Sequence, residues 1–189
     1  MRSFFTFIII VALIAVAVFG YVFWRSYSSL SGAESTLDGR LNAVIAYYAS
    51  LDRQYVTPLK ALPELPPETA VALEVIYEAL LPLSKPPAAY DARLGVLMES
   101  QKTIRRFTLS PGLPPVLTTS TVFADFNKNT SNLGRASALL KECNDAVAAY
   151  NARLLSRSGK LIGQWSSREA KQYLSIDGTL SNDTVIMFN

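Results

Sequence analysis

Apolar residues fill the start of the chain without a break, and further along they recur at every third or fourth position. The unbroken run covers residues 4–23, which contain no charged residue and lie between Arg2 and Arg25. A helix of about 20 residues is about 30 Å long, which is the thickness of the hydrocarbon core of a bilayer. Tyr21 and Trp24 are of the kind found among lipid headgroups. The run therefore predicts an uncleaved transmembrane anchor over residues 1–25.

A cleaved signal peptide is the alternative interpretation of this run. Its apolar core would be shorter, about 7–15 residues, and a small-x-small cleavage site would follow it. Ser26-Tyr27-Ser28 fits such a site poorly. An uncleaved run implies a single-pass protein of the inner (cytoplasmic) membrane, in contact with the lipid bilayer. Positive charges on its two sides lean only slightly towards a cytoplasmic N-terminus, which leaves the side of the soluble domain open.

The periodic part of the chain predicts an all-α fold, an elongated antiparallel bundle of three to four helices. Residues 26–32 are rich in serine and are interpreted as a linker, and the bundle is expected over residues 33–160. Prolines separate the helices, and Pro58 should end or kink the first of them. The apolar positions expected in the core are Leu37, Leu41, Val44, Tyr48, Leu51 and Tyr55 in the first helix, Val71, Ile76 and Leu80 in the second, and Tyr90, Leu94, Leu97, Ile104 and Phe107 in the third.

The last predicted helix, from Phe123 to about Ser156, carries a polar row. Its members are spaced seven residues apart and are Thr130, Ser137, Asn144 and Asn151. An apolar row that includes Leu133, Val147 and Leu154 lies beside it. A repeat of seven suits left-handed packing of helices. The row could equally be the solvated edge of the apolar stripe.

Within this helix the stretch N-D-A-V-A-A-Y-N, residues 144–151, is interpreted as a structural lock. Buried amides at Asn144 and Asn151 must find hydrogen-bond partners, and facing backbone or side-chain groups would supply them. Val147 and Tyr150 would pack between them. A polar residue in a packed seam can fix register at a cost in stability, so Asn144→Leu is expected to keep or raise thermal stability. Ligand binding by the two amides is the alternative.

The tail, residues 161–189, is expected to be partly flexible or bound to a partner. Asp177-Gly178 is a hairpin-turn signal, and residues 184–188 have the composition of a short strand. Trp165 and Tyr173, with basic residues nearby, are typical of an interfacial membrane anchor. The alternative is that Leu161, Ile162 and Trp165 close the open end of the bundle.

The composition of the chain excludes most kinds of catalysis. The chain has 189 residues, no histidine, one cysteine and a formal charge of +3, so it lacks the usual general base and metal ligand and carries no charge that favours nucleic acid. Cys143 directly follows Glu142 and lies two residues before Asp145. These negative charges disfavour the thiolate form that a nucleophile needs. Glu74 and Glu78 stand four apart and could act as paired carboxylates, but a solvated helix face is the preferred interpretation. Arg105-Arg106 complements a helix end or contacts lipid or a partner. No enzyme activity, cofactor or metal is expected.

Four segments together resemble the LemA family: P-P-V-L at 114–117, F-A-D-F at 123–126, L-G-R-A at 133–136 and N-D-A-V-A-A-Y-N at 144–151. A-E-S-T-L-D-G-R-L at 33–41 is similar to the start of the family's first helix, with Glu34 in place of a tryptophan. Cys143 stands where the family's closing pattern has a tyrosine. The family's basic pair after this start and its usual chain ending are both missing here.

The resemblance implies a single-span membrane protein with an antiparallel helical bundle and no similarity to a known enzyme class. It also implies a role of the kind some members of that family have, in membrane organisation or compartment formation. The leading hypothesis is a non-catalytic, membrane-anchored scaffold that contacts a protein partner. An accessory or homo-oligomeric subunit of a larger membrane complex is the second hypothesis, and a membrane-tethered hydrolase that uses carboxylates is the third.

Overall fold

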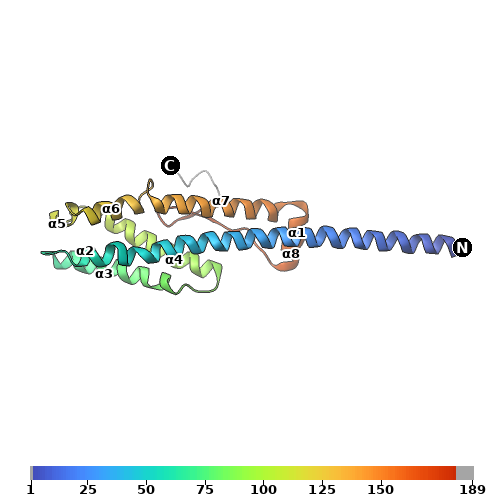
Figure 1. The fold of residues 1–189 in the computed structure, drawn as a ribbon, viewed down its shortest axis with the longest axis horizontal. Helices are drawn as coiled ribbons and strands as arrows, with labels where there is room; N and C mark the ends of the chain where they lie inside the picture. Colours follow the sequence, from blue (N-terminus) through green and yellow to red (C-terminus); the bar gives the residue numbers. More distant parts are fainter. Residues whose placement is uncertain (1, 182–189) are drawn as a thin grey trace.

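One helix, α1 (Arg2–Leu51), runs along most of the length of the molecule, and the other helices gather around the half of it away from the N-terminus (Figure 1). The computed structural model describes residues 2–181. The prediction of a helical chain with a long apolar N-terminal helix is confirmed, and two short strands are the exception among the described residues. The further elements are a π-helical turn (Asp52–Val56), α2 (Thr57–Lys60), α3 (Pro67–Leu80), a 3-10 turn (Leu81–Ser84), α4 (Tyr90–Thr108), α5 (Pro115–Thr118), α6 (Thr121–Thr130), α7 (Arg135–Leu155), α8 (Arg157–Ser166), β1 (Tyr173–Leu174) and β2 (Leu180–Ser181).

The serine-rich segment 26–32, interpreted above as a linker, is instead an uninterrupted part of α1. It contains no proline, and extending an existing helix costs less than starting a new one. Packing also favours the helix, because Leu30 is 1% exposed and Ala33 is 5% exposed. The apolar N-terminal segment is therefore joined to the packed body by a continuous helix of 50 residues, about 75 Å long.

Pro58 does not end this helical path. Proline has no backbone N–H to donate and would disturb a regular helix. The chain widens into the π-helical turn just before it, where the backbone N–H of Thr57 donates to the carbonyl of Asp52. The path then continues as α2 with Pro58 in its first turn, where a missing N–H is tolerated.

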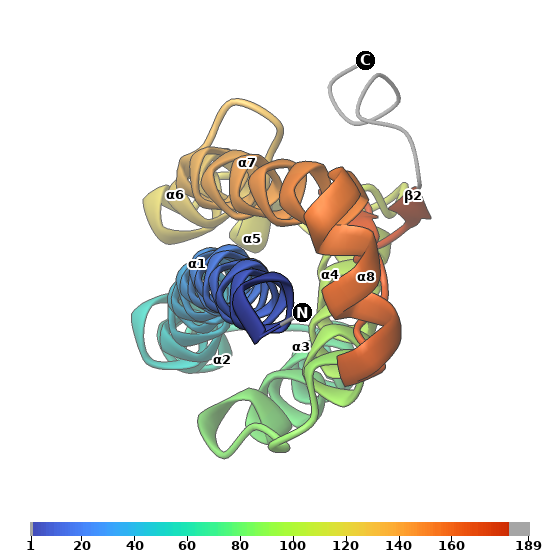
Figure 2. The same cartoon turned by 90° about the vertical axis from the view of Figure 1, so that its right-hand side faces the viewer.

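Viewed end-on, α1 lies between α7 on one side and α3 and α4 on the other (Figure 2). Most of the apolar positions expected in the core are confirmed. Those buried to 7% exposure or less are Leu37, Leu41, Val44, Tyr48, Leu51, Ile76, Leu80, Leu94, Leu97, Ile104 and Phe107. Val71 is the error, since it is 64% exposed while Leu73 is fully buried in its place.

The last helix was expected to be continuous, but it is divided into α6 and α7 at Ser131–Gly134. Side-chain hydroxyls compete for the backbone there: Thr130 donates to the carbonyl of Phe126, and Ser131 to that of Lys128. Gly134 lies so close to the preceding turn that a Cβ would be 2.1 Å from the Lys128 carbonyl oxygen. Leu133, expected in the apolar row, is 97% exposed as a result.

The tail returns to the body over its described length. After α8 the chain becomes extended, and β1 and β2 then pair antiparallel, with Leu174 opposite Leu180. Asp177-Gly178 does form the predicted turn, and the strands on its two sides are β1 and β2. The strand predicted over residues 184–188 lies outside the described residues. Tyr173 is 8% exposed and Leu174 is 3% exposed, so this part of the tail contributes to the core.

Candidate functional site

Two asparagines of α7 hold the extended segment that follows α8. The Nδ2 of Asn144 donates to the carbonyl oxygen of Leu174 at 2.9 Å, and the backbone N–H of Leu174 donates to Asn144 Oδ1 at 3.0 Å. Asn151 makes the same pair of bonds with the backbone of Lys171, at 2.7 and 2.8 Å. Each amide thus takes the place of a neighbouring strand. We call residues 168–174 the strap.

The seven-residue spacing of the polar row fits this arrangement geometrically. Seven residues of α-helix advance about 10.5 Å. The three steps from Lys171 to Leu174 advance about 10 Å in an extended chain. Both amides can therefore meet the strap in one register, with Asn144 buried at 4% exposure and Asn151 half-buried. The row is neither a helix–helix seam nor a solvated edge at these two positions.

Val147 and Tyr150, the other two residues of the predicted lock, lie in the core. Val147 is 1% exposed and Tyr150 is fully buried. Burial raises the pKa of Tyr150, helped by the nearby charge of Glu34, and among the described residues its hydroxyl has no hydrogen-bond partner. Neither side chain is accessible to a partner from outside.

Charged side chains fix the strap on its other sides. Arg168 forms an ion pair with Glu34 of α1 at 2.9 Å, and its guanidinium lies over the ring of Tyr27 at 5.0 Å. The ammonium of Lys171 lies over the ring of Tyr90 of α4 at 4.7 Å. The strap therefore joins α1, α4 and α7 along one side of the body.

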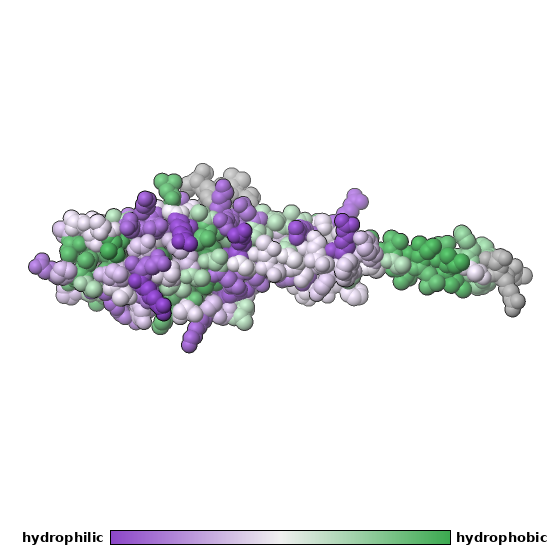
Figure 3. All heavy atoms as spheres, viewed as in Figure 1, coloured by the Kyte–Doolittle hydropathy of each residue, from purple (hydrophilic) through white to green (hydrophobic). Residues whose placement is uncertain are grey.

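A second region of interest is the point where α1 leaves the body. Over residues 4–22, towards its free end, α1 exposes apolar side chains on all sides, and we call this segment the apolar rod. Figure 3 shows it beyond a more polar body. Here α8 packs against α1 and α7, and the rings of Phe23 and Trp165 meet edge to face with centroids 6.2 Å apart. The sequence left open whether this segment closes the end of the bundle or anchors at the membrane interface. Ile162 is buried in the core, as closure of the bundle requires, whereas Trp165 is 85% exposed and does not close it. Tyr173, expected to accompany Trp165, is instead buried in β1.

No protein-family model, curated protein or solved structure matches the chain.

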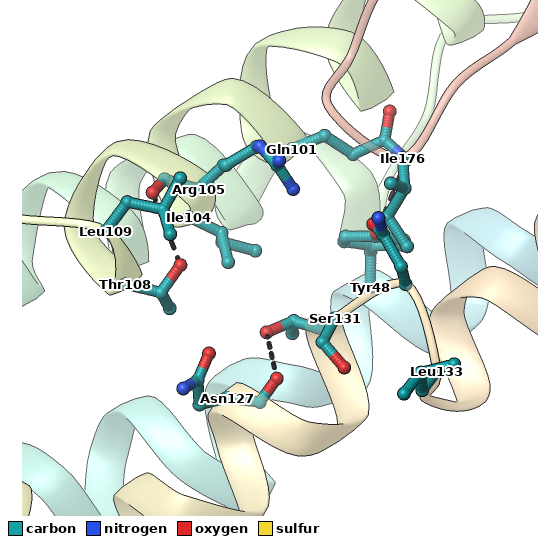
Figure 4. A pocket seen from close by; sticks show the side chains of 12 residues that line it. Tyr48, Gln101, Ile104, Arg105, Thr108, Leu109, Asn127, Ser131, Leu133 and Ile176 are labelled. Atoms are coloured by element: carbon teal, nitrogen blue, oxygen red, sulfur yellow. Dashed lines mark hydrogen bonds between the residues drawn. The ribbon is translucent and has the colours of Figure 1, made fainter. Parts of the chain in front are cut away.

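A pocket of about 290 Å³ opens between α4 and the α6 region, on the half of the body away from the apolar rod (Figure 1), and Figure 4 shows it from close by. Gln101 and Arg105 of α4 face Asn127 and Ser131 of the α6 region across it. Gln101 donates to the hydroxyl of Tyr48 at 3.2 Å, and burial raises the pKa of that hydroxyl well above its ordinary value. The described lining residues include no carboxylate, so the pocket offers no group that would act as a general base near neutral pH.

The remaining candidates for chemistry lie apart from this pocket. Cys143 is 3% exposed, and burial raises the pKa of its thiol to about 11, which keeps it protonated at neutral pH. Glu74 forms an ion pair with Lys60, and Glu78 is exposed on the same helix. Residues 2–181 contain no cluster of three potential metal-ligating side chains of the histidine, cysteine or carboxylate type.

Sequence reasoning missed the partners of the two asparagines. They are backbone groups 20 and 30 residues further along the chain, and backbone groups carry no sequence signal of their own. The apolar residues Tyr173 and Leu174 were the available sign that the tail packs on the body. The pairing of Glu34 with Arg168 was not visible in sequence either.

Proposed function

We propose that this protein is a non-catalytic, membrane-anchored helical-bundle protein of the LemA type, which holds its body at a membrane and presents it to a protein partner. The observation that carries the proposal is the exposed apolar half of α1. Phe4, Ile14 and Phe19 are 67%, 58% and 67% exposed, and none of the most apolar window of this helix is buried. A helix that is apolar on all sides needs an apolar surrounding, and a bilayer supplies it.

The continuity of α1 supports a scaffold rather than a loosely tethered domain. A flexible linker would let the body move freely, whereas a continuous helix fixes its distance and direction relative to the membrane. From Arg25 to the end of α2 at Lys60 the helical path extends about 50 Å. A body of this length would place its far end well beyond the headgroups, within reach of another envelope protein.

Membrane extraction tests the anchor directly. The full chain should stay in the pellet after alkaline carbonate washing, and N-terminal sequencing of the purified protein should start before residue 25. Leu13→Arg places a charge at the centre of the run, which costs about 2.5–3.5 kcal/mol on insertion scales, and should shift part of the chain to the soluble fraction. Ser28→Arg, outside the run, is the control. A soluble wild-type chain, or a mature N-terminus after residue 25, overturns the anchor.

The partner and the side of the membrane are tested together by proximity labelling from the C-terminus with a topology reporter. A recurrent set of labelled membrane or envelope proteins supports the scaffold role. Labelling no different from that of an unrelated single-span protein removes it. Activity in a hydrolase panel that is lost in Glu74→Gln/Glu78→Gln would overturn the non-catalytic part of the proposal in favour of the third hypothesis.

A second candidate function, a subunit of a homo-oligomer or larger complex, is favoured by one surface feature. Val71 and Val75 lie one turn apart on α3 and are 64% and 50% exposed. Native mass in mild detergent distinguishes a monomer from an assembly. Val71→Lys/Val75→Lys should dissociate an assembly that uses this face, whereas Ala43→Lys/Ala46→Lys, at exposed positions of α1, should not.

A further inference from the structure

The body carries a one-sided group of basic residues at the end nearest the apolar rod. Residues 1–33 and 146–168 contain no aspartate or glutamate. Folding brings these two stretches together, because α8 and the end of α7 pack against α1. The basic residues they contribute beyond the rod are Arg25, Arg153, Arg157, Lys160 and Arg168. Only Arg168 has an acidic partner among the ion pairs of the described residues, Glu34.

A polar pocket of about 350 Å³ lies within this group. Arg25 and Ser29 of α1 line one side, and Arg153 and the first turn of α8 line the other. Arg153 donates to the carbonyl oxygen of Ser29 at 2.9 Å, which uses one of the five N–H donors of its guanidinium. The first turn of α8 also brings the positive end of a helix dipole to the pocket. Two arginines and a helix start suit a phosphate group.

An apolar groove of about 360 Å³ adjoins this pocket, and Ser158 lines both. Its walls are Phe19 and Phe23 of α1 and Leu161 and Trp165 of α8. The exposed apolar rod continues directly into this groove, since Phe19 and Val22 belong to both. A chain of methylene groups from the adjacent hydrocarbon would fit along such walls.

We propose that the junction of α1 and α8 binds an anionic phospholipid of the surrounding membrane, with its phosphate in the pocket of Arg25 and Arg153 and an acyl chain in the groove beside Phe23 and Trp165. The proposal rests on the membrane anchoring proposed above. Charge complementarity selects the anionic headgroup, because no carboxylate faces the pocket from its described lining residues. Continuity between the rod and the groove selects a membrane lipid over a water-soluble phosphate compound.

Tryptophan quenching by brominated lipid tests the site in the full chain. The chain has two tryptophans, so Trp24→Phe leaves Trp165 as the single reporter. The protein is reconstituted in phosphatidylcholine vesicles that contain a small fixed fraction of either acyl-brominated phosphatidylglycerol or acyl-brominated phosphatidylcholine. Quenching of Trp165 should be markedly stronger with the brominated phosphatidylglycerol. Arg25→Gln should weaken this preference roughly fivefold, which is the effect of one arginine near an anionic lipid surface, and Arg25→Gln/Arg153→Gln should weaken it further.

Arg106→Gln is the matched control, since Arg106 is an exposed arginine on α4. It should leave the preference unchanged, and helix content by circular dichroism should be the same in all variants. Vesicle flotation separates this proposal from the membrane anchor. If the chain floats but both brominated lipids quench Trp165 equally, the specific site is refuted and the anchor stands. If the chain floats and Trp165 is not quenched, α8 is away from the membrane and the site is refuted as well. If the chain fails to float, both proposals fail.

Discussion

We call the four hydrogen bonds from Asn144 and Asn151 to the backbone of the strap the clamp, and replacing Asn144 by leucine tests it at its most buried point. Asn144 is 4% exposed, and Leu174, whose backbone it binds, is 3% exposed. The substitution removes both bonds at once and leaves a backbone N–H and a backbone C=O of Leu174 without partners. A buried group left in this state costs about 1–3 kcal/mol, so the two together cost about 2–6 kcal/mol if the strap stays in place.

Two effects reduce this loss. Leucine branches at the same carbon as asparagine and has a larger, apolar surface, and its burial returns about 1.5–3 kcal/mol where it fits. The strap can also lift away locally so that water reaches Leu174, which limits the loss to the free energy of that local opening. We expect a net destabilisation of about 2 kcal/mol, which lowers the melting temperature by about 4–8 °C for a domain of this size. The expectation from sequence, that Asn144→Leu keeps or raises stability, is therefore reversed in sign.

Thermal unfolding by circular dichroism and hydrogen exchange of residues 171–176 provide the two measurements. Exchange of the Leu174 amide should accelerate more than that of amides in the middle of α7. Asn151→Leu is the matched comparison, since Asn151 makes the same bonds from a half-buried position where water replaces them more easily. Its effect should be smaller, about 1 kcal/mol. An unchanged or higher melting temperature for Asn144→Leu, with Leu174 still protected, would refute the clamp as a source of stability.

Three further predictions concern the buried thiol and the hairpin. Cys143 should not react with a maleimide at pH 7 until the protein unfolds, because burial raises the pKa of its thiol to about 11; rapid labelling of the folded chain would contradict this. Burial acts to raise the pKa of Asp177, but hydrogen bonds from Thr179 and Ser175 outweigh it and lower the pKa. The charged carboxylate therefore stabilises the hairpin at pH values above its ordinary pKa of about 3.9. Protection of the hairpin amides from hydrogen exchange should fall as the pH drops below that value, and this pH dependence should be absent in Asp177→Asn. Gly178 has φ +76° and lies where a Cβ would be 2.7 Å from the Met98 carbonyl oxygen, so Gly178→Ala should cost about 1–3 kcal/mol in thermal unfolding, and a neutral effect would refute the close approach.

The buried faces of α1 and α4 follow from local rules, and sequence alone was sufficient to predict them. Apolar spacing of three and four identified the buried face of α1 from Leu37 to Leu51 and that of α4 from Leu94 to Phe107. Prolines were predicted to separate the helices, and Pro67 does stand at the first position of α3. Each of these signals acts over one or two helical turns, so neighbouring residues contain all the information needed.

The rest depends on contacts between distant segments or on competition between weak local preferences. The serine-rich stretch 26–32 had no strong preference, and burial of Leu30 settled it as helix. The break at Ser131–Gly134 arose from hydroxyl groups that bind the helix backbone, an effect too small to distinguish from an exposed helical turn in sequence. The strap could not be placed because the asparagine side chains bind backbone groups, which are the same for every residue type except proline.

The strap also determines how far a change in the clamp can reach. It leaves the end of α8 at Arg168, passes Asn151 at Lys171, and reaches Asn144 only at Leu174. The Arg168–Glu34 ion pair and the Asn151 bonds therefore lie between α8 and the most buried bonds of the clamp. Opening at Leu174 frees the hairpin but leaves the end of α8 attached to both α1 and α7. The position of Trp165 at the proposed lipid groove should thus depend on Arg168 and Asn151 far more than on Asn144, although Asn144 is the more buried of the two amides.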